Sequence, residues 1–192
     1  MSALDGLLVN GANKTFMRRY NLFKEALHKI SENIALDTKT RVSALGYYKK
    51  MCNLETGIMA IFWNDILSTL NKTSSTVRSS KIDVNTAATC VKSLREFISE
   101  KKNSFPYYEN LGAELTGTLD YKNQFIRVDD PVLQKIPSKL FRIFQYNRIV
   151  DTFTSALDHR IAGYEQVGLR FGFLANFDKL SASEIAEILK DC

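Results

Sequence analysis

The chain has few of the residues that build metal centres and disulfide frameworks. Its 192 residues include three cysteines, Cys52, Cys90 and Cys192, and two histidines, His28 and His159, with no C-x-x-C pair. Such scattered residues exclude a zinc site built from neighbouring ligands, and an odd cysteine count is not typical of a disulfide scaffold. We therefore expect reduced thiols, no metal and no cofactor.

Two further absences concern membranes and catalysis. No apolar run approaches the roughly 18 residues that a membrane-spanning helix needs, and the N-terminal segment lacks the apolar core of a signal peptide. There is also no Gly-rich phosphate loop, no G-x-S-x-G motif and no H-E-x-x-H motif. We expect a chain that is not secreted, binds no membrane or small-molecule substrate, and is not an enzyme.

What the chain does contain is enough apolar material for a folded core. Hydrophobic residues make up 45% of it and aromatic residues 11%, with only 9 Gly and 3 Pro. This composition excludes collagen-like, low-complexity and disordered chains. The length suits one domain, or one large piece of a bigger one.

Apolar residues recur at helical spacing along the first half of the chain. One stripe runs from Phe16 to Ile34, and a second runs from Met51 to Leu70. A shorter helix is expected from Thr38, continuous with the second stripe because no proline separates them. The polar, hydroxyl-rich residues 71–81 predict a loop, since their side chains compete for backbone hydrogen bonds.

Capping residues and prolines organise the second half. Asp83 is a predicted N-cap for a third helix, which is interrupted at Pro106 and resumes over 107–115. A further helix is expected from Leu140, with Ile143 and Val150 on its apolar side. The spacing of Ser181 and Glu184 in the tail is typical of a capping box that begins a short last helix.

These patterns predict an all-α fold, a multi-helix bundle with at most one short strand or extended linker. Residues 125–128 alternate in polarity and are the strand candidate, and Asp129 and Asp130 beside them predict a solvated turn. The expected organisation is an N-terminal extension (1–13), a helical bundle (14–116), a loop or linker (117–139) and C-terminal helices packed on the bundle (140–192).

The candidate functional residues are basic pairs next to aromatic residues, a mixture that can hold phosphates while rings stack on bases. They form a candidate nucleic-acid-binding set: Phe16, Arg18, Arg19, Lys49, Lys50, Lys101 and Lys102. The alternative interpretation of each pair is a solvated helix face, because the net charge of +5 is mild for this length.

Several phrases, in order, resemble hAT-type transposases and their domesticated relatives, specifically those labelled zinc finger MYM-type protein 1-like. The resemblance extends over nearly the whole chain from Lys14. The phrases that carry it are residues 53–58, 62–67, 70–74, 81–87, 93–94, 105–109 and 153–160, which include the letters NLETGI, FWNDIL and FPYYE.

The resemblance implies that this chain corresponds to the helical insertion of an RNase H-like transposase core. The family's two catalytic aspartates and one glutamate, which would hold the metals for phosphoryl transfer, match no position here. The chain departs from the family at a Thr-Arg-Trp phrase whose tryptophan is thought to stack on DNA, because the corresponding place here reads Lys14, Thr15 and Phe16. Phe16 either stacks on DNA or belongs to the apolar stripe of its helix.

Two functions remain open. One is a catalytically inactive transposase-derived fragment with residual DNA contact and a location that is nuclear, as the family resemblance implies, or cytoplasmic. The other is a helical module that binds a protein partner in transcriptional regulation. Because an insertion packs against the core that it interrupts, exposed apolar surface and self-association are also expected.

Overall fold

The structure is a computed structural model that describes residues 15–79, 82–122 and 136–171. In these ranges every regular element is helical and no strand occurs, which confirms the all-α bundle. The α-helices are α2 (Tyr20–Glu32), α3 (Thr38–Met51), α4 (Leu54–Val77), α5 (Val84–Glu100), α6 (Phe105–Thr116), α8 (Pro137–Phe141) and α9 (Arg148–Phe171).

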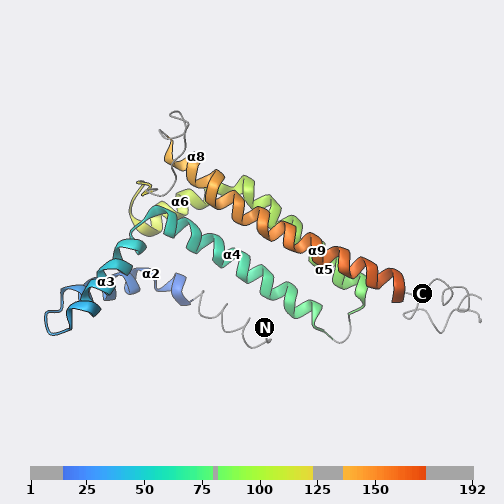
Figure 1. The fold of residues 1–192 in the computed structure, drawn as a ribbon, viewed down its shortest axis with the longest axis horizontal. Helices are drawn as coiled ribbons and strands as arrows, with labels where there is room; N and C mark the ends of the chain where they lie inside the picture. The colour runs from blue at the N-terminus through green and yellow to red at the C-terminus, as the bar shows by residue number, and fades with distance from the viewer. Residues whose placement is uncertain (1–14, 80–81, 123–135, 172–192) are drawn as a thin grey trace, which may run out of the picture.

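The helices form an elongated bundle with a hairpin at one end (Figure 1). The long helices α4, α5 and α9 run along the molecule, and α5 packs along α9 over the most extensive of the helix contacts. The short helix α6 covers the first part of α4. Helices α2 and α3 pack on each other and contact the bundle only sparsely, so they project from it as a hairpin.

An aromatic cluster forms the centre of the bundle. The ring of Phe62 from α4 meets Tyr146 edge-on at 4.9 Å, and Phe105 from α6 meets the same tyrosine at 5.1 Å between ring centroids. Burial of each large side chain contributes about 1.5–3 kcal/mol. The fully buried side chains of this core are Leu54, Ile58, Phe62, Ile66, Ile98, Phe105, Tyr108, Phe141, Tyr146 and Val150.

The predicted stripe of α4 is buried as expected, but both of its boundaries differ from the prediction. The expected continuity with the preceding helix is wrong, because Asn53 takes an extended conformation (φ −86°, ψ 138°) between α3 and α4. The predicted loop over 71–81 is also wrong in its first part, because α4 continues to Val77. Hydroxyl groups do not end this helix: Thr76 Oγ1 donates to the carbonyl oxygen of Lys72 one turn earlier, at 3.0 Å.

Helix α5 begins as predicted. Asp83 caps it, with its Oδ1 accepting a hydrogen bond from the backbone N–H of Thr86 at 2.8 Å. The interruption before Pro106 is a 3₁₀ turn, Lys101–Ser104, and the proline then lies in the first turn of α6, where its missing N–H does not matter. Helix α6 ends at Gly117, whose φ of 77° suits a residue without a Cβ.

Helix α4 and helix α6 approach each other closely at two glycines. A Cβ on Gly112 would lie 2.8 Å from the backbone nitrogen of Ile58, and a Cβ on Gly57 would lie 2.8 Å from the carbonyl oxygen of Gly112. Neither position has room for a side chain. These glycines therefore allow the two backbones to pack directly.

A π-helical segment, Arg142–Asn147, connects α8 to α9 without a break. In an α-helix, residues five apart point about 140° away from each other, whereas the wider π turn brings them nearer to one face. Phe141 and Tyr146, which are five apart, are both fully buried. Ile143, predicted on the apolar side, is instead 47% exposed, because the expectation assumed uniform α-helical spacing.

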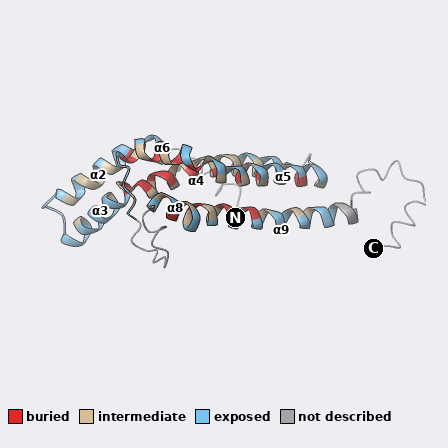
Figure 2. Cartoon of the chain, turned by 90° about the horizontal axis from the view of Figure 1, so that it is seen from above, coloured by how far each residue is buried: buried red, intermediate tan, exposed pale blue. Residues whose placement is uncertain are grey.

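The stripe of the first helix is much less buried than that of α4 (Figure 2). Tyr20 is buried, but Phe23 is 44% exposed, and Ile34 lies beyond the end of α2 and is 86% exposed. The predicted helix to Ile34 therefore extends too far. The predictions on residues 1–13, 125–128, Asp129, Asp130, Ser181, Glu184 and Cys192 lie outside the described residues.

Candidate functional site

The two ends of the hairpin meet at a buried hydrogen bond. The Tyr20 hydroxyl at the start of α2 donates to the carbonyl oxygen of Met51 at the end of α3, at 2.7 Å. Burial, followed by the nearby Cys52, raises the pKa of Tyr20 to about 12. This contact brings together two basic pairs that are 31 residues apart in the chain, and we call their four residues the hairpin base: Arg18, Arg19, Lys49 and Lys50.

The hairpin carries the net positive charge of the whole chain. Residues 15–53 contain eight basic and three acidic residues, a net charge of +5. The other residues contain 18 basic and 18 acidic residues, because the chain has 26 and 21 in total. The bundle residues that the structure describes, 54–79, 82–122 and 136–171, contain 12 basic and 11 acidic residues, so the bundle is nearly neutral and the hairpin is the basic part of the described chain.

The acidic residues of the hairpin are engaged away from its base. Glu25 pairs with Lys29 at 2.6 Å, and Glu32 lies 3.2 Å from His28 Nδ1. Asp37 caps α3, and its hydrogen bonds from Thr40 lower the pKa of its carboxyl group. In the described ranges, no carboxylate forms an ion pair with the hairpin base, whose four residues are all exposed.

Phe16 lies beside the hairpin base and packs against aromatic neighbours. Its ring centroid is 5.3 Å from that of Tyr20 and 5.6 Å from that of Phe23, and the residue is half-buried. Of the two alternatives for Phe16, this placement favours packing in the hairpin. Stacking on a nucleic-acid base remains a prediction.

The third basic pair lies in the bundle, away from the other two. Lys101 Nζ is 3.7 Å from Asp65 Oδ2 and 4.1 Å from the ring centroid of Phe97, and its side chain is only 15% exposed. Lys102 forms an ion pair with Asp151. Asp65 is eleven residues along α4 from Leu54, or about 16 Å at 1.5 Å per residue, so this pair is well separated from the hairpin base.

Lys101 and Lys102 take part in the polar contacts that hold the aromatic core. Their carbonyl oxygens accept hydrogen bonds from Tyr146 Oη at 2.7 Å and Arg142 Nη2 at 3.1 Å, which satisfies backbone groups at the end of α5. The Tyr108 hydroxyl donates to Asp65 at 2.8 Å. Burial, and then this hydrogen bond, raise the pKa of Tyr108 well above its usual range.

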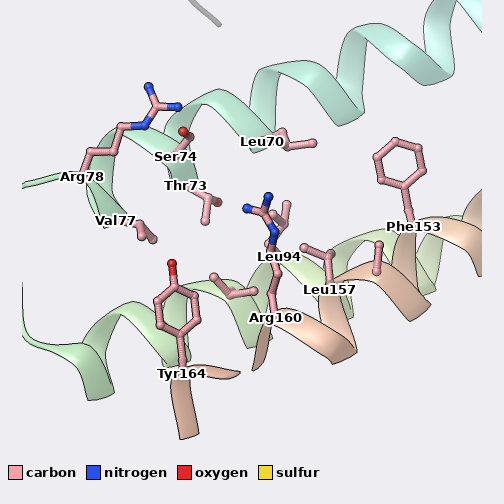
Figure 3. Close-up of a pocket in the computed structure, with 12 residues that line it drawn as sticks. Leu70, Thr73, Ser74, Val77, Arg78, Leu94, Phe153, Leu157, Arg160 and Tyr164 are labelled. Atoms are coloured by element: carbon pink, nitrogen blue, oxygen red, sulfur yellow. The ribbon is translucent and has the colours of Figure 1, made fainter. Parts of the chain in front are cut away.

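A cleft of about 380 Å³ lies farther along the bundle, between α4 on one side and α5 and α9 on the other. Arg160 reaches into it from α9 (Figure 3). Reasoning from the sequence missed this cleft, although one signal was present. Phe153, Leu157, Arg160 and Tyr164 recur at helical spacing, which places a guanidinium within an apolar stripe.

No family model matches the chain, and neither curated proteins nor solved structures give a significant match. In the described residues, no three His, Cys, Asp or Glu side chains are grouped so that they could hold a metal ion. None of the described helices combines the length and the apolar character needed to cross a membrane.

Proposed function

We propose that this chain is a non-catalytic helical module related to the insertion region of hAT-type transposases, and that its hairpin base contacts the phosphate backbone of DNA. The observation that carries the proposal is the convergence of Arg18, Arg19, Lys49 and Lys50 on one end of the hairpin. These four cations are exposed and face no acidic partner in the described ranges. A DNA contact goes with a nuclear location, which is part of the same proposal.

The hairpin base binds phosphates through charge and not through base sequence. Each cation that neutralises a phosphate releases a condensed counterion, so binding weakens as salt concentration rises. Four contacts predict a slope of about −3.6 in a plot of log affinity against log salt. The nearly neutral bundle adds little to this term, so the slope reports the hairpin.

A charge-matched pair of variants tests the proposal. In the test variant, Arg18, Arg19, Lys49 and Lys50 are all replaced by Gln. In the control, Lys72, Lys122, Lys139 and Arg148, which are exposed residues outside the hairpin, are replaced by Gln. Both variants lose four positive charges.

The readout is fluorescence anisotropy with labelled double-stranded DNA over a salt series. We expect wild type and control to bind with steep salt dependence, and the test variant to lose at least tenfold in affinity with a much flatter slope. An equal loss in both variants would show that only net charge matters and would contradict a hairpin contact. Absence of binding by folded wild-type protein at low salt would reject the DNA function altogether.

A second candidate function, binding of a protein, is favoured by the apolar surface of the same hairpin. Eight large hydrophobic residues of the hairpin are at least 37% exposed: Leu22, Phe23, Ile30, Ile34, Leu36, Val42, Leu45 and Tyr47. A groove between α2 and α3 is lined by Leu27, Ile30, Ala44 and Tyr47 together with polar residues. The partner that fits this surface is an acidic amphipathic helix, whose charge complements the +5 of the hairpin.

The exposed apolar residues give this second candidate its own test. Ile30→Ser and Tyr47→Ser remove apolar surface from the groove without changing charge, and these residues are 37% and 59% exposed. Titration with a labelled acidic amphipathic peptide should show weaker binding to this double variant than to wild type. Unchanged peptide binding by the double variant would reject the apolar surface as the binding site.

A further inference from the structure

The cleft between α4 and α9 has the form of a ligand site and plays no part in the proposed DNA contact. Near α6 the aromatic core fills the space between the long helices. Toward the other end of α4, between Leu70 and Val77, about 380 Å³ of space remains between α4 and the pair α5 and α9. This volume is within the range of small-molecule sites.

The walls of the cleft are largely apolar, with a few polar groups. Leucine, valine, alanine and phenylalanine side chains come from all three long helices, and two hydroxyl residues and a tyrosine lie among them. The apolar lining residues are Leu70, Val77, Val91, Leu94, Phe153, Ala156 and Leu157. No carboxylate is among the described residues that line the cleft.

Arg160 is an exposed residue of α9 whose charged side chain lines the cleft, as does that of Arg78. Its guanidinium extends from α9 toward Thr73 on α4, whereas Arg78 stands at the end of the cleft with its side chain directed away from α9 (Figure 3). The neighbouring acids of α9 are engaged with α5: Asp158 with Arg95 at 3.0 Å, and Glu165 with Lys92 at 2.7 Å. In the described part of the chain, Arg160 therefore has no carboxylate partner.

We propose that this cleft binds a small apolar carboxylate, a molecule with an aliphatic chain and one negative charge at its end. The chain lies along Leu70, Phe153 and Leu157, and the carboxylate pairs with the Arg160 guanidinium, whose forked donors match its two oxygens. The Thr73 hydroxyl across the cleft is a further donor. One inward guanidinium suits a monoanion better than a phosphate dianion.

The experiment is a calorimetric titration of the full chain with sodium decanoate below its micellar range. Decan-1-ol, which has the same chain length and no charge, is the ligand control. Arg160→Gln removes the guanidinium, and Arg148→Gln removes an exposed one from the same helix outside the cleft. Circular dichroism confirms that both variants are folded.

We expect saturable binding of decanoate to wild type and Arg148→Gln, and at least tenfold weaker binding to Arg160→Gln. Decan-1-ol should bind wild type weakly and respond little to Arg160→Gln. Absence of saturable decanoate binding, or equal affinity in wild type and Arg160→Gln, would overturn the proposal. Neither result bears on the DNA contact, because Arg160 lies outside the hairpin.

Fluorescence of Trp63, the single tryptophan of the chain, tests whether the ligand binds in the cleft. The Trp63 ring is 5.4 Å from that of Phe153, which lines the cleft, so a ligand that packs along Phe153 changes the surroundings of the tryptophan and its fluorescence. The expected result is a fluorescence change that saturates together with the calorimetric heat. Heat without any change in fluorescence would place decanoate at another site and overturn the assignment.

Discussion

The bundle and the hairpin are both helical, but they use their apolar residues in opposite ways. In the bundle, residues such as Phe62 and Ile58 are completely buried, whereas in the hairpin Val42 is 63% exposed and Leu22 is 61% exposed. Their charges differ as well, since the described bundle residues carry +1 and the hairpin carries +5. The comparison indicates that the bundle supplies stability and the hairpin supplies a surface for binding.

The largest expected effect comes from truncating the aromatic core. Phe62→Ala removes a ring that contacts Tyr108 and Tyr146, and it should lower the free energy of unfolding by about 3–5 kcal/mol. Val42→Ala in the hairpin should change it by less than about 0.5 kcal/mol. Guanidinium denaturation measures both variants, and similar losses would remove the distinction between the two regions.

A glycine pair tests the close contact between α4 and α6. Gly112→Ala forces a Cβ to within 2.8 Å of the Ile58 backbone, so we expect a loss of about 1–3 kcal/mol in the free energy of unfolding. Gly163→Ala, in α9, meets nothing within 4 Å and should stabilise by up to about 1 kcal/mol through helix propensity. Chemical denaturation of both variants should give opposite signs, and a stable Gly112→Ala protein would contradict the close packing.

The contact at the hairpin base predicts a particular alkaline response. Tyr20→Phe removes the hydrogen bond to the Met51 carbonyl and should cost about 1 kcal/mol at neutral pH. The pKa of Tyr20 is raised to about 12, so the folded state holds this proton more tightly than the unfolded state, in which tyrosine titrates near 10. The contribution of the protonated Tyr20 to the free energy of unfolding is complete below pH 10 and is lost as the pH rises toward 12.

Stability measured from pH 8 to pH 12 checks this sign. Wild type should lose more stability over the interval from pH 10 to pH 12 than Tyr20→Phe does, because the variant lacks this titrating group. Parallel curves for the two proteins would show that Tyr20 has an ordinary pKa. Tyr108 and Tyr146, whose pKa values are also raised, are present in both proteins and cancel in the comparison.

The smallest changes in stability are expected when the N-cap of one helix in each region is removed. Asp37 and Asp83 each accept a backbone N–H and a threonine hydroxyl three residues later. Asp83→Ala should lower the melting temperature of the bundle, whereas Asp37→Ala should speed hydrogen exchange in α3 and leave the main melting transition almost unchanged. A lower melting temperature in both variants would indicate that the hairpin unfolds together with the bundle.

Much of the bundle could be predicted from the sequence because local signals agree with the packing there. The Asp83 cap, the interruption near Pro106 and the stripe from Leu54 to Ile66 all depend on residues close together in the chain. The extension of α4 to Val77 was missed, because hydroxyl residues can also bond back to the helix. The π-helical segment has no comparable local signal, so Ile143 was misplaced.

The candidate site could be predicted only in part. The basic pairs are visible in the sequence, but the Tyr20–Met51 contact that joins Arg18 and Arg19 to Lys49 and Lys50 is tertiary. Phe97 and Lys101 are four residues apart, a spacing that brings side chains together on a helix, but no local signal indicates that Lys101 also approaches Asp65 of α4. Periodicity also cannot show whether another helix covers an apolar stripe, so the exposure of apolar residues in the first helix could not be predicted from the sequence.

Hydrogen exchange measured by mass spectrometry, with and without double-stranded DNA at low salt, tests the division between bundle and hairpin most directly. In the free protein we expect slow exchange in the buried parts of α4, α5 and α9 and faster exchange in α2 and α3. DNA should slow exchange at the two ends of the hairpin around residues 18–19 and 49–50, and leave the bundle unchanged. Protection by DNA over the bundle alone, with the hairpin unaffected, would contradict the account.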